Sequence, residues 1–315
     1  MKRHHQSWGR YPRVEQEVVR LSSRHENLTL DSIDGKTALP RGNGRSYGDS
    51  CLNDGGILID ARGLDHFIAF DSTTGVLRCE AGVLLADILK LVVPKGWFVA
   101  ATPGTQLITV GGAIANDVHG KAHHQDGTFG QHVRCFELLR SDGSRFLCSP
   151  SENPEWYRAT IGGLGLTGVI LWAEIALKRI SNPYIDSETI KCANLNEFFE
   201  VSADSDQDYE YTVAWVDCTA RGQNLGRALF SRGNHAPADH GKTPSAPGQG
   251  HTFPIMPPVS LVNGLTLRSF NKFYYHRQYK RHQQAIMHYI PFFYPLDAML
   301  EWNRIYGPNG FFQYQ

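Results

Sequence analysis

The chain has 315 residues, of which 41% are hydrophobic and 20% charged, and its 31 Lys and Arg residues balance its 31 Asp and Glu residues. This composition is typical of a globular protein large enough for two domains, and the zero formal charge excludes a strong general attraction to nucleic acid. Six cysteines without a CxxC pair give no support for a zinc ribbon or a redox dithiol. No apolar run is long enough for a transmembrane helix and no signal peptide is visible, so we expect a cytoplasmic protein or one peripheral at the inner membrane.

Strands and helices alternate in the first half of the chain. Apolar runs and turn residues predict a strand or helix at 14–21, strands at 56–60, 67–71 and 76–81, and a helix at 84–93. A hairpin is predicted at 133–139 and 145–148, a short helix from Ser151 and a strand at 169–177.

The organising stretch runs from residue 103 to residue 130 and holds six glycines, three histidines and one lysine among small residues. Such a composition lets the backbone approach a ligand closely. We expect Thr109 to cap a short helix at 111–115, whose first turn offers unpaired N–H groups to an anion such as a pyrophosphate. Residues 116–121 then return a titratable imidazole and a cation to the same site. The alternative is a glycine-rich turn that only links two strands.

A second ligand loop is predicted at residues 41–49, where three glycines alternate with polar residues after a short apolar run. This pattern is typical of a nest of backbone N–H groups that binds phosphate oxygens.

One glycine motif is a decoy. Residues 163–168 match the GxGxxG pattern, but the dinucleotide fingerprint needs a strand before it and a helix after it. Here the preceding residues are predicted to be helical and the following ones a strand. A nicotinamide-binding Rossmann site is therefore not expected, and the glycines indicate another close approach of backbone to a ligand.

The composition becomes more aromatic and polar after residue 182, where we place a domain boundary. A strand at 209–217 is expected to pair with 226–231, and the Pro-, Gly- and His-rich residues 233–258 predict a mobile loop or lid. Basic and aromatic side chains alternate through 266–295. Such a stretch can lie on an anionic membrane surface or bind a lipid phosphate, and the alternative is a solvated helix with a packed aromatic face. Residues 311–315 are predicted to be extended.

Several of these motifs together identify a family. The glycine loop at 41–49, Pro103-Gly104-Thr105, residues 109–115, Val118-His119-Gly120-Lys121, the glycines at 162–168 and residues 301–304 resemble flavoproteins of the vanillyl-alcohol oxidase type, in particular the decaprenylphosphoryl-β-D-ribose oxidases and their bacterial homologues. The resemblance implies an α+β fold, with a PCMH-type FAD-binding domain of two α+β subdomains at 1–182. It also implies an antiparallel-sheet substrate domain at 183–315. The family pattern continues past Gln315, so we expect a C-terminally truncated chain with an incomplete substrate domain.

The same resemblance implies roles for individual residues. The expected FAD contacts are Arg41, Gly42, Asn43, Gly44, Arg45, Ser46, Tyr47, Gly104, Thr109, Gly111, Gly112, Asn116, His119 and Ile170, the last near the adenine. His119 and Lys121 are the expected catalytic residues beside the flavin, and the expected substrate contacts are Tyr47, Lys121, Trp215, Leu296 and Gln315. Arg45 stands where many relatives carry a histidine bonded to the flavin, which implies non-covalent FAD. Phe293 stands where relatives carry a tyrosine.

The implied function is an FAD-dependent oxidation of a secondary alcohol on a sugar, with the 2'-hydroxyl of a polyprenylphosphoryl-ribose as substrate and flavin N5 as hydride acceptor. It implies a partner reductase in an epimerisation, a place in cell-wall polysaccharide biosynthesis and a peripheral membrane contact. The alternatives are an aldonolactone oxidase resembling D-arabinono-1,4-lactone oxidase and a flavin-binding remnant without catalysis. A metal-binding module built on His119, His123 and His124 is disfavoured, because no acidic or cysteine ligand lies nearby in the sequence, and we expect no metal.

Overall fold

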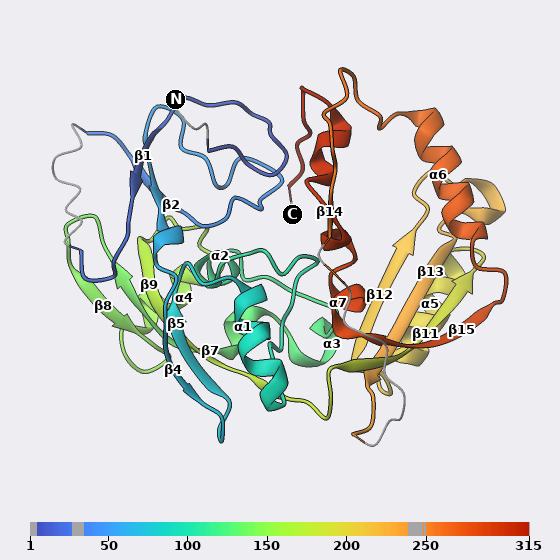
Figure 1. Cartoon of the computed structure of the whole chain (residues 1–315), viewed down its shortest axis with the longest axis horizontal. Coiled ribbons are helices and arrows are strands. Elements are labelled where there is room, and N and C mark those ends of the chain that lie inside the picture. The colour runs from blue at the N-terminus through green and yellow to red at the C-terminus, as the bar shows by residue number, and fades with distance from the viewer. Residues whose placement is uncertain (1–4, 27–34, 239–247, 249, 315) are drawn as a thin grey trace. The chain divides into compact units, whose positions relative to one another are not determined.

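The computed structural model describes residues 5–26, 35–238, 248 and 250–314 (Figure 1). The chain divides into two compact units. Unit 1 consists of Met1–His119, Thr128–Arg179 and Asn309–Gln315, and unit 2 consists of Gly120–Gly127 and Ile180–Pro308. Each unit combines β-sheets with helices, which confirms the predicted α+β class. The division into an FAD-binding domain at 1–182 and a substrate domain at 183–315 stays a prediction.

Unit 1 contains a parallel sheet of three strands in the order β1-β3-β2. The strands are β1 Glu17–Arg20, β2 Ala38–Arg41 and β3 Ile57–Asp60. All four residues of β3 are buried, as expected of the central strand in a parallel sheet, where both faces are covered. Strand β2 ends at Arg41, so the first glycine loop, residues 41–48, leaves from the end of this sheet.

A second sheet of unit 1 is antiparallel, with the strand order β4-β5-β9-β7-β8. The central strand β9 alternates buried and half-buried side chains toward its end, because its successive residues face opposite sides of the sheet. The remaining elements of the unit connect to this sheet. The bounds are β4 Phe67–Asp71, β5 Val76–Glu80, β7 Val133–Leu139, β8 Arg145–Cys148, β9 Val169–Ala176, the ladder of β6 Trp97–Phe98 with β10 Lys178–Arg179, and the helices α1 Leu85–Val92, α2 Val110–Ala115 and α4 Pro154–Thr160.

One apolar cluster joins the two sheets of unit 1. It contains Leu21, which follows β1, Ile59 of the parallel sheet, and Leu139, Val169 and Leu171 of the antiparallel sheet, all almost fully buried. Helix α1 buries an apolar face of its own at a spacing of three and four residues, which is the period of an amphipathic helix. Burial of this apolar surface holds the two sheets together. It thereby stabilises the parallel sheet, from which the first glycine loop begins at the end of β2.

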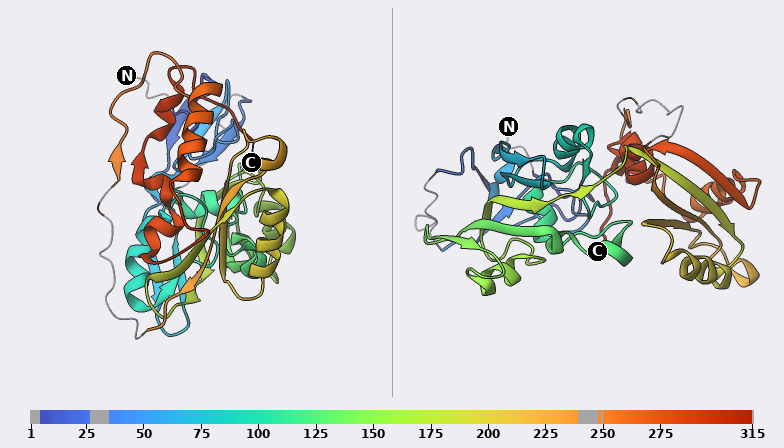
Figure 2. Two further views of the ribbon diagram at one scale, coloured as in Figure 1. Left: turned by 90° about the vertical axis from the view of Figure 1, so that its right-hand side faces the viewer. Right: turned by 90° about the horizontal axis from the view of Figure 1, so that it is seen from below.

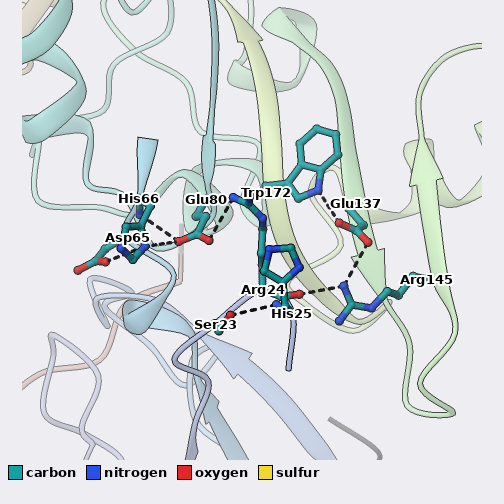
Figure 3. Close-up of polar contacts among 9 residues, drawn as sticks. All are labelled: Ser23, Arg24, His25, Asp65, His66, Glu80, Glu137, Arg145 and Trp172. Carbon is teal, nitrogen blue, oxygen red and sulfur yellow. Dashed lines mark hydrogen bonds and ion pairs between the residues drawn. The ribbon is translucent and has the colours of Figure 1, made fainter. Parts of the chain in front are cut away.

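Polar contacts hold the N-terminal segment against the antiparallel sheet (Figure 3). Arg24 pairs with the buried carboxylate of Glu80 at 3.4 Å, and Arg145 donates to the carbonyl of Arg24 at 2.8 Å. Arg145 also pairs with Glu137, whose carboxylate accepts the indole N–H of Trp172 at 2.5 Å. The segment before the first glycine loop is thus fixed by charge-assisted hydrogen bonds to strands far away in the sequence.

Unit 2 is built on an antiparallel sheet of four strands in the order β12-β13-β11-β15. Helix α5 lies along one face of this sheet, where Phe198 and Val201 pack on the buried Ile190 and Phe230 (Figure 2). The bounds are β11 Tyr184–Cys192, β12 Tyr211–Val216, β13 Ala228–His235, β15 His282–His288, the parallel pair β14 His251–Thr252 and β16 Met299–Leu300, and the helices α3 His123–Asp126, α5 Leu195–Ser205, α6 Gly264–His276 and α7 Tyr289–Phe293.

Most predicted elements are confirmed within a residue or two, because their apolar periodicity is regular. These are the strands at β3, β4, β5, β9 and β12, helices α1 and α2, and the β7–β8 hairpin. Strand β13 pairs with β12 as predicted, but it ends four residues later than the predicted end at residue 231. The ambiguous stretch at 14–21 forms a strand, β1. The glycine decoy also lies as predicted, with helix α4 before it and strand β9 after it.

Four expectations differ from the structure. Helix α4 begins at Pro154 with Asn153 as its N-cap, not at Ser151, because proline suits the first helical position. The predicted loop at 233–258 contains the end of β13, which pairs with β11, and the short strand β14; residues 239–247 and 249 lie outside the described residues. Residues 266–295 form α6, β15 and α7 in turn. Residues 311–314 form no strand, and Phe311 makes only a single parallel bridge with Arg10.

Candidate functional site

The first glycine loop of unit 1 surrounds a buried arginine. The side chain of Arg41 is 8% exposed, and its Nη2 and Nη1 atoms donate to the carbonyls of Gln6 at 2.8 Å and Gly42 at 3.3 Å. Its Nε atom has no hydrogen-bond partner within the described chain. Burial lowers the pKa of Arg41, because a guanidinium loses hydration when it is enclosed, although the residue stays charged at neutral pH.

The loop lies directly over this guanidinium. Gly44 adopts a left-handed backbone with φ of 63°, and a Cβ atom built there would lie 1.9 Å from Arg41 Nη2. The backbone N–H groups of Asn43 and Gly44 form no hydrogen bond with any described group of the chain. A buried cation and unpaired N–H groups therefore occupy one small region, which suits an anion such as a diphosphate.

The second glycine stretch contains helix α2, and Thr109 is its N-cap as predicted, since Oγ1 accepts the N–H of Gly112 at 3.1 Å. The expectation of unpaired N–H groups in its first turn is wrong. Val110 donates to the carbonyl of Val83 at 2.9 Å, and Gly111 donates to that of Ala81 at 2.8 Å. The start of the helix lies against residues 81–84, so its donors are already used. The first turn of α2 therefore offers no unpaired N–H group, unlike the first glycine loop.

The two glycine stretches pack against each other within unit 1. Asn43 Nδ2 donates to the carbonyl of Leu107 at 2.7 Å. A Cβ atom on Gly42 would lie 2.2 Å from Thr109 Oγ1, so the backbone of the loop touches the cap of α2. Glycine is required at position 42 because any side chain would separate these two segments. The structure thus brings together the predicted cofactor residues of both stretches.

The segment after α2 carries His119 to the surface of unit 1. Asn116 Nδ2 returns to the carbonyl of Gly112 at 2.8 Å, and Asp117 turns the chain with a left-handed φ of 42°. The Asp117 carboxylate accepts the N–H of Gly130 at 2.8 Å, which closes the stretch on itself. His119 is exposed just beyond this turn. The contacts of Asn116 and Asp117 fix the course of the backbone that leads to His119.

Lys121 belongs to unit 2, where its ammonium group is largely enclosed. The Nζ atom donates to the carbonyl of Phe293 at 3.0 Å and lies 5.7 Å from the centre of that ring. Burial lowers the pKa of Lys121 to about 8, because enclosure disfavours the charged form. The Lys121 carbonyl accepts the N–H of Thr212 in β12, and Phe293 packs edge-on against the buried Tyr211. A lysine held in this way changes charge near physiological pH.

The other predicted contact residues are spread over the two units, and their roles stay predictions. In unit 1, Tyr47 packs edge-on against Phe311 at 5.3 Å between ring centres, and Ile170 is buried in β9. In unit 2, Trp215 packs on Tyr274 of α6, and Leu296 is exposed. Gln315 lies outside the described residues.

The glycine decoy touches the chain itself. The N–H groups of Gly162 and Leu164 donate to the carbonyls of Ile114 and Ala115 at 3.0 and 2.8 Å, at the end of α2. A Cβ atom on Gly168 would lie 2.4 Å from the carbonyl oxygen of Leu139. These glycines therefore approach other backbone groups of the chain, and the predicted approach to a ligand stays a prediction.

Sequence reasoning missed one cluster of potential metal ligands in unit 1, formed by Asp65, His66 and Glu80 (Figure 3). The Glu80 carboxylate accepts a hydrogen bond from the backbone N–H of His66 at 3.0 Å, and it lies 2.9 Å from Nδ1 of the His66 ring. The same carboxylate pairs with Arg24. These partners and the nearby guanidinium disfavour a cation there. We assign the cluster a structural role in joining the N-terminal segment to β5. The spacing of these residues in the sequence did not indicate a metal site, because residue 80 is distant in the sequence from residues 65 and 66.

Comparison with known proteins shows which protein family the region of the two glycine stretches resembles. Residues 27–149 match the family of the FAD binding domain. This part of the chain therefore resembles an FAD-binding domain. The matched range covers both glycine stretches, and the buried guanidinium and free N–H groups of the first loop fit the diphosphate of FAD. Identification of FAD as the cofactor is thereby confirmed.

Relatives of the FAD-binding domain extend the comparison to the rest of the chain. The chain is 38% identical over 291 residues to decaprenylphosphoryl-beta-D-ribose oxidase of Mycolicibacterium smegmatis, an alignment that covers 89% of this chain and 63% of that protein. It is 36% identical over 157 residues to an uncharacterized protein of Streptomyces coelicolor, covering 50% and 42%, and 30% identical over 114 residues to human Delta(24)-sterol reductase, covering 36% and 22%. The chain thus spans less than two thirds of each of these relatives.

A membrane-spanning helix is not found among the described residues, because none of their helices is both long enough and apolar enough to cross a bilayer.

We predict that Gly44→Ala weakens FAD binding at least roughly tenfold more than Gly55→Ala does. Both glycines have a positive φ, so both substitutions carry the same backbone strain of about 1–2 kcal/mol. Only at position 44 does the new methyl group displace a guanidinium, since nothing lies within 4 Å of a Cβ atom at position 55. Titration of each variant with FAD, followed by flavin fluorescence, measures the difference. Equal affinities would exclude a role for the Arg41 position in cofactor binding.

Proposed function

We propose that this chain is part of an FAD-dependent oxidoreductase that oxidises a secondary alcohol of a sugar. The observation that carries the proposal is the buried Arg41 beneath the unpaired N–H groups of the first glycine loop, inside the range that matches the FAD binding domain. The 38% identity over most of the chain to an oxidase of decaprenylphosphoryl-beta-D-ribose supports the reaction class. When bound, FAD supplies the acceptor for the hydride.

The proposed FAD contacts follow the two glycine stretches. Loop residues 41–47 hold the diphosphate, with Arg41 as the buried counter-charge. The remaining contacts are proposed along the cofactor at Gly104, Thr109, Gly111, Gly112, Asn116 and His119, with Ile170 near the adenine. The FAD is non-covalent, because Arg45 cannot form the histidyl bond to the flavin.

His119 and Lys121 are the proposed catalytic residues. An exposed imidazole after the α2 turn can accept the proton of the reacting hydroxyl, since imidazoles exchange protons near neutral pH. The ammonium of Lys121, held by the Phe293 carbonyl, can stabilise a developing alkoxide or bind a phosphate. Phe293 holds the ammonium of Lys121 through its backbone carbonyl, and the centre of its buried ring lies 5.7 Å from the Lys121 Nζ atom.

The proposed substrate is a polyprenylphosphoryl-ribose, oxidised at its 2'-hydroxyl. Tyr47, Lys121, Trp215, Leu296 and Gln315 are the proposed substrate contacts. The product is a ketone, so a partner reductase is required if the overall reaction is an epimerisation. A lipid-linked substrate further implies peripheral contact with a membrane.

The purified chain should show the absorbance of oxidised flavin, and acid precipitation should release all of it into the supernatant. This outcome follows from FAD held by charge and hydrogen bonds alone. A yellow pellet would contradict the assignment of Arg45 to a non-covalent site. Absence of flavin after reconstitution with free FAD would contradict the proposed cofactor role of this chain.

His119→Ala should abolish turnover while the variant retains bound flavin with an unchanged spectrum. The reason is that the imidazole is proposed to take the substrate proton, whereas its backbone is positioned independently by Asp117 and Gly130. Turnover is measured with a polyprenylphosphoryl-ribose and, in competition, with a soluble aldonolactone. His123→Ala is the matched control and should keep its activity. Normal turnover by the His119 variant would remove this residue from the mechanism.

Turnover should fall as the pH rises through about 8, because burial lowers the pKa of Lys121 to about 8 and the ammonium loses its charge above that value. Lys121→Arg should move this fall to higher pH, since a guanidinium stays protonated. Lys121→Met should be slow at every pH. The pH dependence of kcat for the three proteins measures this effect. An unchanged alkaline limb in the arginine variant would assign the fall to another group.

A further inference from the structure

Charge is distributed unevenly in unit 2. Although the whole chain carries equal numbers of basic and acidic residues, residues 250–296 contain no Asp or Glu. The same stretch contains the basic residues Arg268, Lys272, Arg277, Lys280 and Arg281, all exposed. A run of this length without a single carboxylate gives the surface one sign of charge.

Helix α6, drawn in orange in Figure 1, has few buried side chains. Only Asn271 and Tyr275 are buried, and they anchor the helix through hydrogen bonds to the Asp217 carboxylate at 2.7 Å and to the Cys192 carbonyl at 3.2 Å. Its N-terminus is closed by a capping box between Asn263 and Thr266. The helix is therefore firmly attached while most of its surface is exposed.

The exposed side of α6 is apolar. Successive residues are rotated by about 100° around a helix, so Phe273 lies on the side away from Asn271 and Tyr275. Leu265 is 77% exposed, Phe273 is 72% exposed and Phe270 is 55% exposed. The predicted alternative for this stretch, a helix with a packed aromatic face, is therefore wrong for Phe270 and Phe273.

Exposed apolar side chains also occur in the sequence just before and just after α6. We call these residues, together with the exposed residues of the helix, the α6 surface. Its exposed apolar members are Ile255, Met256, Val259, Leu261, Leu265, Leu267, Phe270, Phe273 and Tyr279. Its basic members Arg268, Lys272 and Lys280 form no ion pair within the described chain. Arg281 pairs with Glu197, and Arg277 stacks on Tyr274. A concentration of exposed apolar side chains of this kind marks an interaction site.

We propose that the α6 surface docks on an anionic lipid bilayer. Exposed aromatic and aliphatic side chains flanked by lysine and arginine are the combination that inserts into the interface of a bilayer, with the apolar groups among the acyl chains and the cations at the headgroups. Charge complementarity selects this partner, because the surface offers cations and no carboxylate. Bilayer docking rests on the proposed function in one respect: the proposed lipid-linked substrate would lie in the bilayer to which the α6 surface binds.

The test is flotation of the 315-residue chain with vesicles of phosphatidylcholine, with and without phosphatidylglycerol. The chain should float with the anionic vesicles and remain behind with the neutral ones, and added salt should weaken binding. Arg268→Glu with Lys272→Glu should lower the partition coefficient by at least roughly 25-fold, at about fivefold for each basic residue lost. Leu265→Ser with Phe273→Ser should also release the protein.

Two control pairs separate this surface from general effects of charge and exposed apolar groups. Arg158→Glu with Arg221→Glu changes the same charge elsewhere, and Phe199→Ser with Leu225→Ser removes exposed apolar groups elsewhere in unit 2. Both controls should bind vesicles as the parent does. Thermal unfolding of every variant should match the parent, since the changed side chains are exposed.

Three results would overturn the proposal: equal binding to neutral and anionic vesicles, undiminished binding by the Arg268 and Lys272 variant, or no binding with self-association through Phe270 and Phe273 instead. The proposed function fails separately. Turnover of a short-chain soluble substrate should survive the α6 variants, while turnover of the vesicle-bound substrate should fall. Vesicle binding without any turnover would leave the α6 surface intact and remove the enzymatic assignment.

Discussion

The guanidinium of Arg41 is enclosed at the end of a parallel strand, and the glycine loop that follows is shaped around it. A buried cation with an unpaired N–H group is costly unless an anion or carbonyl groups compensate it. Here carbonyls of Gln6 and Gly42 satisfy part of the group, and Nε remains without a partner in the described chain. The glycines at 42 and 44 follow from this constraint, because a side chain at either position would displace Thr109 or Arg41 itself.

The second glycine stretch differs from the first in that the backbone groups at the ends of its helix are paired. Helix α2 uses its first N–H groups on the carbonyls of residues 81–83, and its last carbonyls accept N–H groups from Gly162 and Leu164. Both ends of this short helix are therefore held by protein backbone, which makes it a rigid support. The glycines and alanines of α2 add little side-chain bulk to the helix. A flat cofactor could therefore pack closely against it.

The two proposed catalytic side chains are held in different ways. His119 follows a turn closed by Asp117 and Gly130 in unit 1, whereas Lys121 is held by Phe293 and β12 in unit 2. The chain passes from one unit to the other at Gly120, between them. Burial lowers the pKa of Lys121, and within unit 2 the carbonyl of Phe293 at the end of α7 accepts the hydrogen bond of its ammonium group.

The sequence by itself determined the regular elements, the presence of two glycine loops, the rejection of the GxGxxG motif and the flavoprotein assignment, because apolar periodicity and glycine spacing are local properties. Tertiary structure decided which N–H groups remained unpaired, since the donors of α2 are satisfied by a segment nearly thirty residues earlier in the chain. It also decided that Phe270 and Phe273 of α6 are exposed while Tyr275 is buried. Periodicity shows that a helix has an apolar side, but only the neighbouring elements determine whether that side is covered.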